Sequence, residues 1–472
     1  MSSGLSKNTQ RMLNGKHIWL YVLLLSLPIL INNLIKSFNG MIDIYFVARI
    51  KDASPETINS AIAALNIHES FNNLILAIGV GLSIAAMAIV SQFIGAKRED
   101  KAKFYAAQLI TLAVIVGVII TGLILGFSWI IIDILGAKGE TYNFALEYFN
   151  IRSIELVGVI FFLVYQAIRQ AQGSTIMPTI LNISGILVNT VLTWYFVEIL
   201  NLGVVGSAWS TVIGNLMFVP LMILDLFTSR RYMRLKTNAF VPKKSTLKEI
   251  WPFVYPATIS HSVTFFGFLI INSFVLSQFG DIISAAFSTG NKLSNLLMNP
   301  IYAITTISAV FIGANIGNKQ PERAVSVYRQ TGILTFSLTV VAVLIAILFR
   351  ESFVILLVGS SNPRLIQVSI EYTLWLLLTQ PVMSIFQNYM AIFNGSGQSN
   401  LGMKAQSFRL WGLRIPLLFL FWFIFPQMNY SVVWTAMNIS NVIALFHAHH
   451  LRKNIQLTIR VNLEDALAEV GT

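Results

Sequence analysis

The chain has 472 residues, of which 55% are hydrophobic and only 11% are charged, and its formal net charge is +12. A soluble domain carries about 25% charged residues, so the composition excludes an ordinary soluble protein and predicts a polytopic membrane protein. The chain contains no cysteine, which excludes disulfides, cysteine-bound metals and cysteine nucleophiles.

Twelve apolar stretches follow one another along the chain, each long enough to cross a bilayer as a helix of about 20 residues. A polar tail precedes the first stretch, which is too long for a signal peptide and is expected to be a retained span. The predicted fold class is therefore all-α, with 12 transmembrane helices. In chain order the stretches cover 17–48, 59–94, 104–132, 143–168, 178–199, 205–227, 252–279, 283–314, 327–349, 366–394, 407–426 and 430–450.

The basic residues are spread unevenly over the predicted loops. If the N-terminus is cytoplasmic and the spans alternate, most of the 32 lysines and arginines fall on the cytoplasmic side. Arg409 and Arg414 belong to this cytoplasmic set, whereas Arg152 falls on the outer side of the membrane. The positive-inside rule accounts for such a bias, so the net charge requires no nucleic-acid partner. We expect a multi-pass protein of the plasma (inner) membrane with both termini in the cytoplasm.

The longest basic loop, residues 228–249, divides the spans into two sets of six. Short matches relate the two halves, such as Ile94 with Ile316 and Pro28 with Pro256. Six spans in each half give both halves the same orientation, and transporters built from such repeats bind substrate between the halves near the midplane. The expected organisation is a cytoplasmic tail (1–16), an N-terminal lobe (17–227), a basic cytoplasmic linker (228–249), a C-terminal lobe (250–454) and a cytoplasmic tail (455–472).

Several short motifs occur in an order and at spacings that carry a family resemblance. They are LSLP ending at Pro28, Asp43, Gly81, VSQFIGA (Val90–Ala96), Arg169 with Gly173 and Pro178, Asn189, LGVVGSAWST (Leu202–Thr211), Pro256 and FNGSG (Phe393–Gly397). Through them, the chain resembles the multidrug and toxic compound extrusion (MATE) family, within the wider MATE and polysaccharide-flippase superfamily. The resemblance implies two pseudo-symmetric six-helix lobes around a V-shaped cavity. It also implies proton- or sodium-driven export of organic, often cationic, compounds by alternating access.

The resemblance also implies a cation-coupling site in the N-terminal lobe. Asp43, Asn189 and Thr211 match the family pattern, but Thr193 stands where many members have a second acid. With a single carboxylate, a proton is favoured over sodium as the coupling ion, although these four side chains offer oxygen ligands for Na⁺ as well. The acids that some sodium-coupled members use in the C-terminal lobe are absent from this sequence, which argues against coupling there.

Asp43 is also singled out by physical chemistry alone, because a carboxylate in an apolar span is costly and therefore a functional candidate. A proton, a sodium ion or a cationic compound would neutralise it, and mutually exclusive binding would give antiport. Pro28 removes one helical hydrogen bond and predicts a bend in the first span. The alternative is that Asp43 caps the outer end of this span and lies in water.

Other ionisable residues in the spans carry further hypotheses. Lys36 lies two helical turns before Asp43 and would hold it ionised or attract an anionic substrate, unless it snorkels to the interface. Glu69 and Lys292 lie at nearly equivalent depths in the two halves and would form a gate across the central cleft, unless loop water solvates them. His68 and His261 are candidate protonatable groups, with ordinary hydrogen bonding as the alternative for His68. No cluster of residues suggests a metal site.

Competing functions are weighed by the motifs that they require. The phosphate-binding pattern of ATPases is absent, and no enzyme motif is present, so we expect neither ATP hydrolysis nor an enzyme. The main alternative is a flippase for lipid-linked or oligosaccharide substrates, which commonly has 14 spans; a channel or receptor is the third. We predict a monomeric secondary-active exporter of small amphipathic compounds, surrounded by membrane lipids, with H⁺ as coupling ion, Na⁺ as the alternative and no cofactor.

Overall fold

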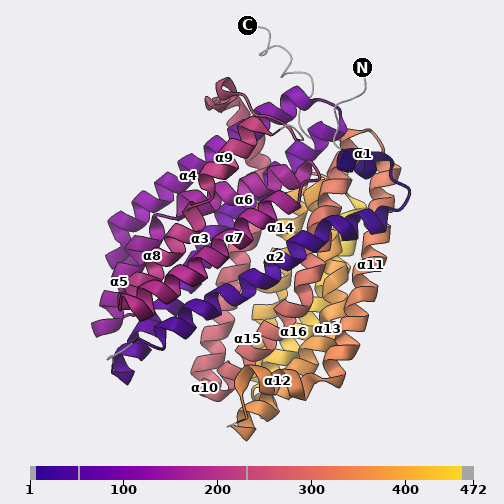
Figure 1. Ribbon diagram of the computed structural model, residues 1–472. Coiled ribbons are helices and arrows are strands. Elements are labelled where there is room, and N and C mark those ends of the chain that lie inside the picture. Colours follow the sequence, from indigo (N-terminus) through magenta and orange to yellow (C-terminus); the bar gives the residue numbers. More distant parts are fainter. Residues whose placement is uncertain (1–6, 51–53, 230–231, 361, 460–472) are drawn as a thin grey trace. The chain divides into compact units, whose positions relative to one another are not determined.

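The computed structural model describes residues 7–50, 54–229, 232–360 and 362–459, and every regular element within these ranges is a helix (Figure 1). The predicted all-α membrane fold is confirmed. The first half contains α1 (Lys7–Asn14), α2 (Ile18–Val47), α3 (Pro55–Gly95), α4 (Glu99–Ile134), α5 (Gly139–Ser153), α6 (Leu156–Ala171), α7 (Ile176–Trp194), the π-helix η1 (Tyr195–Ile199), α8 (Gly203–Leu216), α9 (Val219–Thr228) and the 3₁₀-helix η2 (Thr237–Phe240).

The second half begins with the longest helix of the chain. Its elements are α10 (Lys244–Gly317), α11 (Pro321–Leu348), α12 (Arg350–Val358), α13 (Pro363–Gly395), α14 (Ser399–Ser407), the π-helix η3 (Phe408–Arg414), α15 (Ile415–Ile424), the 3₁₀-helix η4 (Pro426–Met428) and α16 (Ser431–Lys453). The start of α13 shows why a helix forms where it does. Asn362 caps it by accepting a hydrogen bond from the Leu365 amide (3.1 Å), and Pro363 occupies the first turn, where a missing N–H costs nothing.

The helices account for all twelve predicted spans. Nine helices of the described chain are long and apolar enough to cross a membrane, and α5 with α6, bent by 47°, makes a tenth. The long α10 holds two spans, because its backbone leaves helical geometry at Gly280 (φ 76°, ψ −174°), a conformation that glycine adopts at little cost. The more polar α13, 33 residues long, covers the predicted stretch 366–394 and completes the set.

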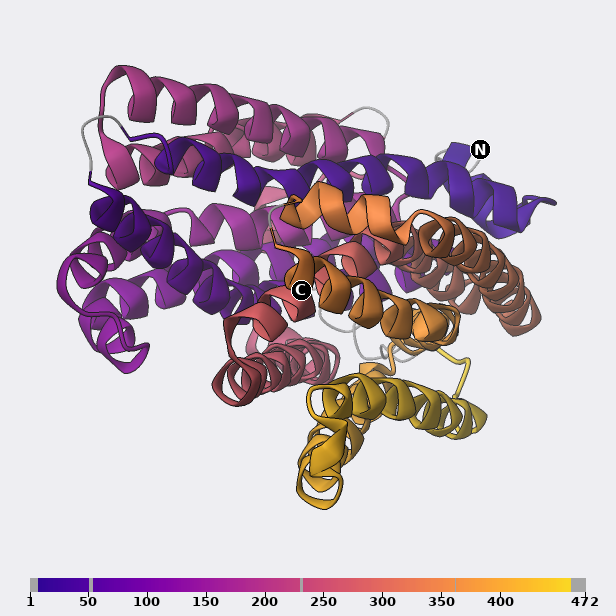
Figure 2. The ribbon, with the colours of Figure 1, turned by 90° about the horizontal axis from the view of Figure 1, so that it is seen from below.

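The described residues form two compact units. The first contains residues 27–94 and 98–254 with the segment up to residue 10, and the second contains 11–26, 95–97 and 255 onward. The division falls inside α2, between Ser26 and Leu27, directly before Pro28. In the first unit α4 packs against α6, and α7 packs against α8; in the second, α13 packs against α11 and α16. The helices of each unit can be followed by colour in Figure 2.

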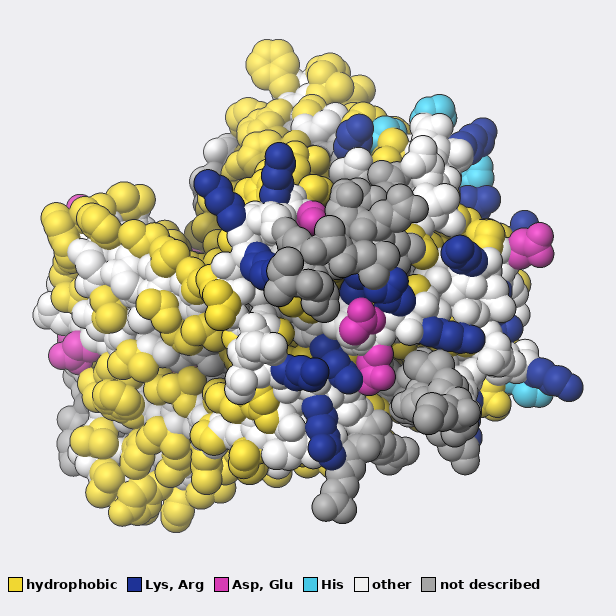
Figure 3. Space-filling view, turned by 90° about the horizontal axis from the view of Figure 1, so that it is seen from above, with side chains coloured by type: hydrophobic (Ala, Val, Ile, Leu, Met, Phe, Trp, Pro, Cys, Tyr) yellow, Lys and Arg dark blue, Asp and Glu magenta, His cyan; other side chains and the backbone are white. Residues whose placement is uncertain are grey.

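The exterior is strongly apolar. Phe423, Leu356 and Ile134 are among the most exposed hydrophobic side chains, with Phe423 83% exposed. In Figure 3 hydrophobic side chains cover much of the face that is drawn, and lysine and arginine side chains gather in one part of it. Lipid tails are the solvent that such an apolar surface requires.

The linker after α9 is held against the first unit by specific hydrogen bonds. Gln108 on α4 donates to the carbonyls of Ala239 (2.6 Å) and Val241 (2.7 Å) and accepts from the Lys243 amide (3.0 Å). Arg169, which is fully buried, pairs with Asp225 (2.7 Å) and donates to the Met233 carbonyl. These contacts satisfy backbone groups that would otherwise lack partners, so part of the predicted linker belongs structurally to the N-terminal unit.

Candidate functional site

Asp43 lies inside the first unit, where α2 meets α7 and α8. Its side chain is only 5% exposed, so in this structure it does not lie in water. Two threonine hydroxyls face the carboxylate: Thr193 Oγ1 is 3.3 Å from Oδ1, and Thr211 Oγ1 is 3.4 Å from Oδ2. Both contacts are long for an O–H···O hydrogen bond, and no ion pair to Asp43 is found among the described residues.

Each of these threonines has a second, closer acceptor in its own helix. Thr193 Oγ1 lies 2.9 Å from the Asn189 carbonyl, and Thr211 Oγ1 lies 3.0 Å from the Ser207 carbonyl. Thr193 Oγ1 also lies 2.6 Å from Ser210 Oγ, and either atom could be the donor. A hydroxyl has one hydrogen to donate, so each threonine can turn it either to Asp43 or to another acceptor. Both hydroxyls that face the carboxylate therefore have another acceptor within reach.

Asn189 joins the hydroxyls into one network. Its Nδ2 lies 2.9 Å from Thr211 Oγ1, 3.3 Å from Thr193 Oγ1 and 3.4 Å from Ser210 Oγ. Its Oδ1 is buried and has no partner among the described residues. A buried amide oxygen without a donor is unusual, and it leaves one acceptor of the network free. The structure thus brings Asp43, Asn189, Thr193 and Thr211 together.

The two helices that carry this network approach each other closely. A Cβ on Gly214 of α8 would lie 2.7 Å from the Asn189 Cβ, and a Cβ on Gly185 of α7 would lie 2.6 Å from the Gly214 carbonyl oxygen. Side chains cannot fit at such distances, so glycine at both positions permits the contact. The pair sets the spacing at which Asn189 reaches Thr211.

A buried ion pair lies in the first unit and was not predicted from the sequence. Arg152 and Glu155 lie 2.6 Å apart and are 11% and 2% exposed, and Tyr148 and Asn215 complete the network with hydrogen bonds of 2.8 Å. Tyr148 packs in one cluster with Val47 of α2 and with Val204 and Ala208 of α8, so the ion pair lies beside the helices that carry Asp43 and Thr211. The placement of Arg152 on the outer side remains a prediction, but its burial in an ion pair was not predicted. Its position inside the apolar stretch 143–168, three residues before an acid, is the signal that could have revealed the pair.

The remaining predicted residues lie in varied surroundings. His68 is buried between the rings of Tyr148 and Phe149, each at 5.0 Å. Lys36, Glu69 and Lys292 are exposed on their own units, and His261 is half-buried. The influence of Lys36 on Asp43 and the gate formed by Glu69 and Lys292 remain predictions. Pro28 lies within a continuous α2, at the division between the units.

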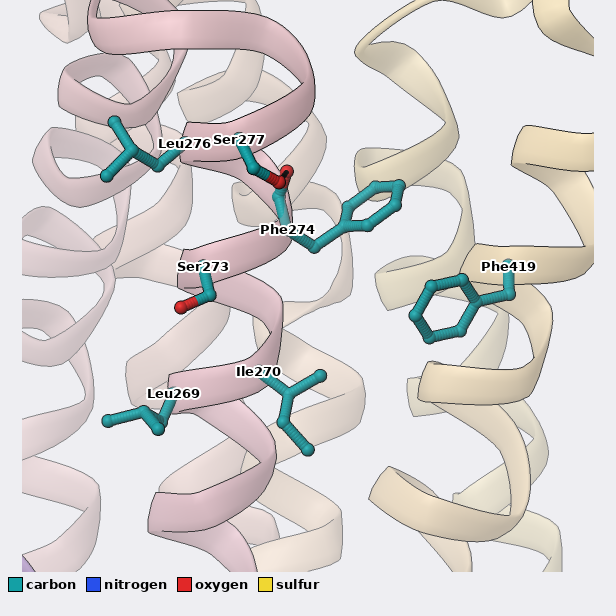
Figure 4. A pocket seen from close by; sticks show the side chains of 7 residues that line it. All are labelled: Leu269, Ile270, Ser273, Phe274, Leu276, Ser277 and Phe419. Carbon is teal, nitrogen blue, oxygen red and sulfur yellow. Dashed lines mark hydrogen bonds between the residues drawn. The ribbon is translucent and has the colours of Figure 1, made fainter. Parts of the chain in front are cut away.

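The second unit has an apolar pocket on its surface. It has a volume of 570 Å³ and lies between the first part of α10 and α15 (Figure 4). It contains no ionisable side chain, so it offers no group for cation coupling. Its lining residues are Leu269, Ile270, Ser273, Phe274, Leu276, Ser277 and Phe419.

Comparisons with known proteins agree on one family. The MatE family model matches residues 28–195 and 256–420. The multidrug export protein MepA of Staphylococcus aureus is 25% identical over 268 residues, which cover 57% of this chain and 58% of that protein. MepA of Staphylococcus haemolyticus is 23% identical over 445 residues, covering 91% and 93% of the two chains.

Solved structures show the same fold. A MATE transporter in the straight conformation superposes with a TM-score of 0.84 at 22% identity, covering 95% of this chain and all of that one. An outward-facing multidrug resistance transporter of the MATE family gives a TM-score of 0.85 at 22% identity, covering 95% and 98%. The twelve spans, the two units and the match of the family model in both halves lead to one conclusion: this chain is a multi-pass membrane protein that belongs to the MatE family.

Proposed function

We propose that this protein is a secondary-active exporter that exchanges protons for small amphipathic, often cationic, organic compounds, with Asp43 as the coupling acid. The observation that carries the proposal is the environment of Asp43. Its carboxylate is buried without an ion-pair partner among the described residues and is held only by two hydroxyls that have alternative acceptors. Such a charge is costly in an apolar medium, so a bound proton or cation is strongly favoured.

Coupling follows if the proton and the cargo exclude each other at this carboxylate. Protonation removes the charge that a cationic compound would pair with, and the new hydroxyl must itself donate. Thr193 and Thr211 can then turn their hydrogens to the carbonyls of Asn189 and Ser207. Since α2 passes from one unit to the other beside Pro28, we propose that the rearrangement at Asp43 changes the bend of α2 and biases the alternation between two conformations.

Sodium is the alternative coupling ion. Asp43, Thr193, Thr211 and the unpaired Asn189 Oδ1 would all present oxygen atoms to it. The proton is favoured because the site has a single carboxylate. We further propose that the protein acts as a monomer in the plasma (inner) membrane, with both termini cytoplasmic and without ATP.

A reconstituted transport assay tests the proposal. Purified protein in liposomes receives a pH gradient or a sodium gradient separately, and uphill movement of a fluorescent lipophilic cation is followed. We expect a response to the pH gradient that is lost in Asp43→Asn and kept in the control Asp133→Asn, which alters an exposed acid on α4. A response of wild type to sodium alone would replace the proton by sodium, and unchanged pH-driven export by Asp43→Asn would refute the role of Asp43.

A further inference from the structure

Two arginines lie buried inside the second unit, and no acid among the described residues balances them. Arg409 is 5% exposed and Arg414 is 2% exposed, and both belong to the π-helix η3, within a span. Their placement on the cytoplasmic side remains a prediction, and their burial was not predicted from the sequence. Guanidinium groups remain charged in proteins, so the C-terminal unit holds two positive charges in its interior.

The partners of both guanidinium groups are neutral. Arg414 donates to Asn441 Oδ1 (2.6 Å) and Ser440 Oγ (3.1 Å), and Arg409 Nη1 donates to the same Asn441 oxygen (3.3 Å) and contacts the Met383 sulfur. One shared amide oxygen sets the two cations side by side, although like charges repel. The faces of Phe386 and Phe268 lie 5.3 and 5.7 Å from them, which offsets only part of the charge.

The two arginines retain a hydrogen-bond donor that has no acceptor among the residues that the structure describes. Arg409 Nε is buried without a partner among the described residues. No salt bridge to either arginine is found in the described part of the chain. A buried cation normally requires a counter-charge, and the described part of this chain provides none here.

The site has a counterpart in the other half of the chain. In the first unit, the fifth and sixth spans carry Asn189 and Thr193 opposite Ser210 and Thr211, around the acid Asp43. In the second unit, the eleventh and twelfth spans carry Arg409 and Arg414 opposite Ser440 and Asn441. Corresponding spans thus build a polar site in each half, with an acid in one and with two cations in the other.

We infer that Arg409 and Arg414 form a binding site for an oxyanion, a carboxylate or phosphate group, in the C-terminal half of the chain. The planar guanidinium fork matches such groups and binds them through paired hydrogen bonds. The oxyanion belongs either to a soluble organic compound or to a lipid headgroup. This site does not depend on proton coupling at Asp43, and it would reject cationic cargo by charge repulsion.

The test measures binding rather than transport, so its result is independent of the proposed exporter activity. Wild type is purified in dodecyl maltoside and delipidated, and its melting temperature is followed while sodium benzoate or sodium phosphate replaces sodium chloride at constant ionic strength. Phosphatidylglycerol is titrated into the same micelles in a second arm. We expect a saturable rise in melting temperature: a response to the soluble ions assigns a soluble ligand, and a response to the lipid alone assigns a headgroup.

Variants separate an oxyanion site from a structural role of the arginines. Arg414→Gln and Arg409→Gln should each weaken the response at least tenfold, and Arg414→Lys, which keeps the charge but loses the fork, should be intermediate. The control Arg364→Gln removes an exposed arginine of the same unit and should respond as wild type. In chloride alone, Arg414→Gln should melt no lower than wild type, because it removes an unbalanced cation.

Three results would overturn the inference. One is that neither the soluble oxyanions nor the lipid raises the melting temperature of wild type. Another is that the response to oxyanions is equal in Arg364→Gln and Arg414→Gln. The third is that Arg414→Gln melts well below wild type in chloride alone, which is the pattern of a purely structural hydrogen-bond donor.

Discussion

The buried pair of Arg152 and Glu155 provides a sharp test of how the N-terminal half is stabilised. Glu155→Gln would leave the Arg152 guanidinium buried without its counter-charge, although Tyr148 would still accept a hydrogen bond from it. Removing one member of a buried ion pair costs about 3–5 kcal/mol, whereas replacing both members by apolar residues of similar size is often neutral. We therefore expect Glu155→Gln to be strongly destabilising and the double variant Arg152→Met/Glu155→Leu to be close to wild type.

The magnitude can be converted into a melting temperature. For a unit of about 235 residues, 1 kcal/mol corresponds to roughly 2–4 °C, so the single variant should melt roughly 6–20 °C below wild type in detergent. The exposed pair Glu99 and Lys103 (3.2 Å) provides the control, since Glu99→Gln should cost less than about 1 kcal/mol. A single variant as stable as Glu99→Gln, or a double variant less stable than Glu155→Gln, would refute the reasoning.

Three further predictions follow from the same half of the chain. Gly214→Ala should displace Asn189, lower the free energy of unfolding by about 1–3 kcal/mol and reduce export. Gly122→Ala is the control, since a Cβ there would meet nothing within 4 Å, and it should leave export unchanged. Equal export by both variants would contradict the close contact of α7 and α8. Thr211→Val should remove one donor to Asp43 and one acceptor for Asn189, and it should slow pH-driven export in the same liposomes. The control Thr228→Val, on the exposed end of α9, should leave the export rate unchanged. A single coupling acid predicts electroneutral exchange of one proton for one monovalent cation. An imposed membrane potential should therefore leave the transport rate unchanged. A steep dependence of the rate on voltage would require a second proton site.

The fold was largely predictable because the composition of a membrane span differs so strongly from that of a loop. Twelve apolar stretches became twelve helical spans, and the break between the seventh and eighth fell close to the predicted loop, at Gly280. The bend of 47° between α5 and α6 was not predicted. It occurs at Arg152 and Glu155, whose pairing depends on contacts that no periodicity reveals.

The candidate site was predictable at the residue whose type is rare in membrane spans and whose charge is costly to bury. Asp43 is an acid in an apolar stretch, so the cost of burying its charge singles it out from the sequence alone. Ser210 and the alternative acceptors of the threonines were not predicted. Hydroxyl side chains are common in spans, and only their distances to neighbouring polar groups show which of them belong to the network. The burial of Arg409 and Arg414 was not predicted, because the positive-inside rule counts charges by sequence position, whereas the π-helix η3 turns both side chains into the protein interior.

Release of a proton on cargo binding tests the central claim most directly. Tetraphenylphosphonium is added to purified, weakly buffered protein in detergent at a pH where the site is protonated, and a pH indicator reports the change. If one carboxyl accepts either the proton or the cargo, wild type should release up to about one proton per bound cation, and Asp133→Asn should behave the same. Asp43→Asn should release none. Undiminished proton release by Asp43→Asn would contradict the account.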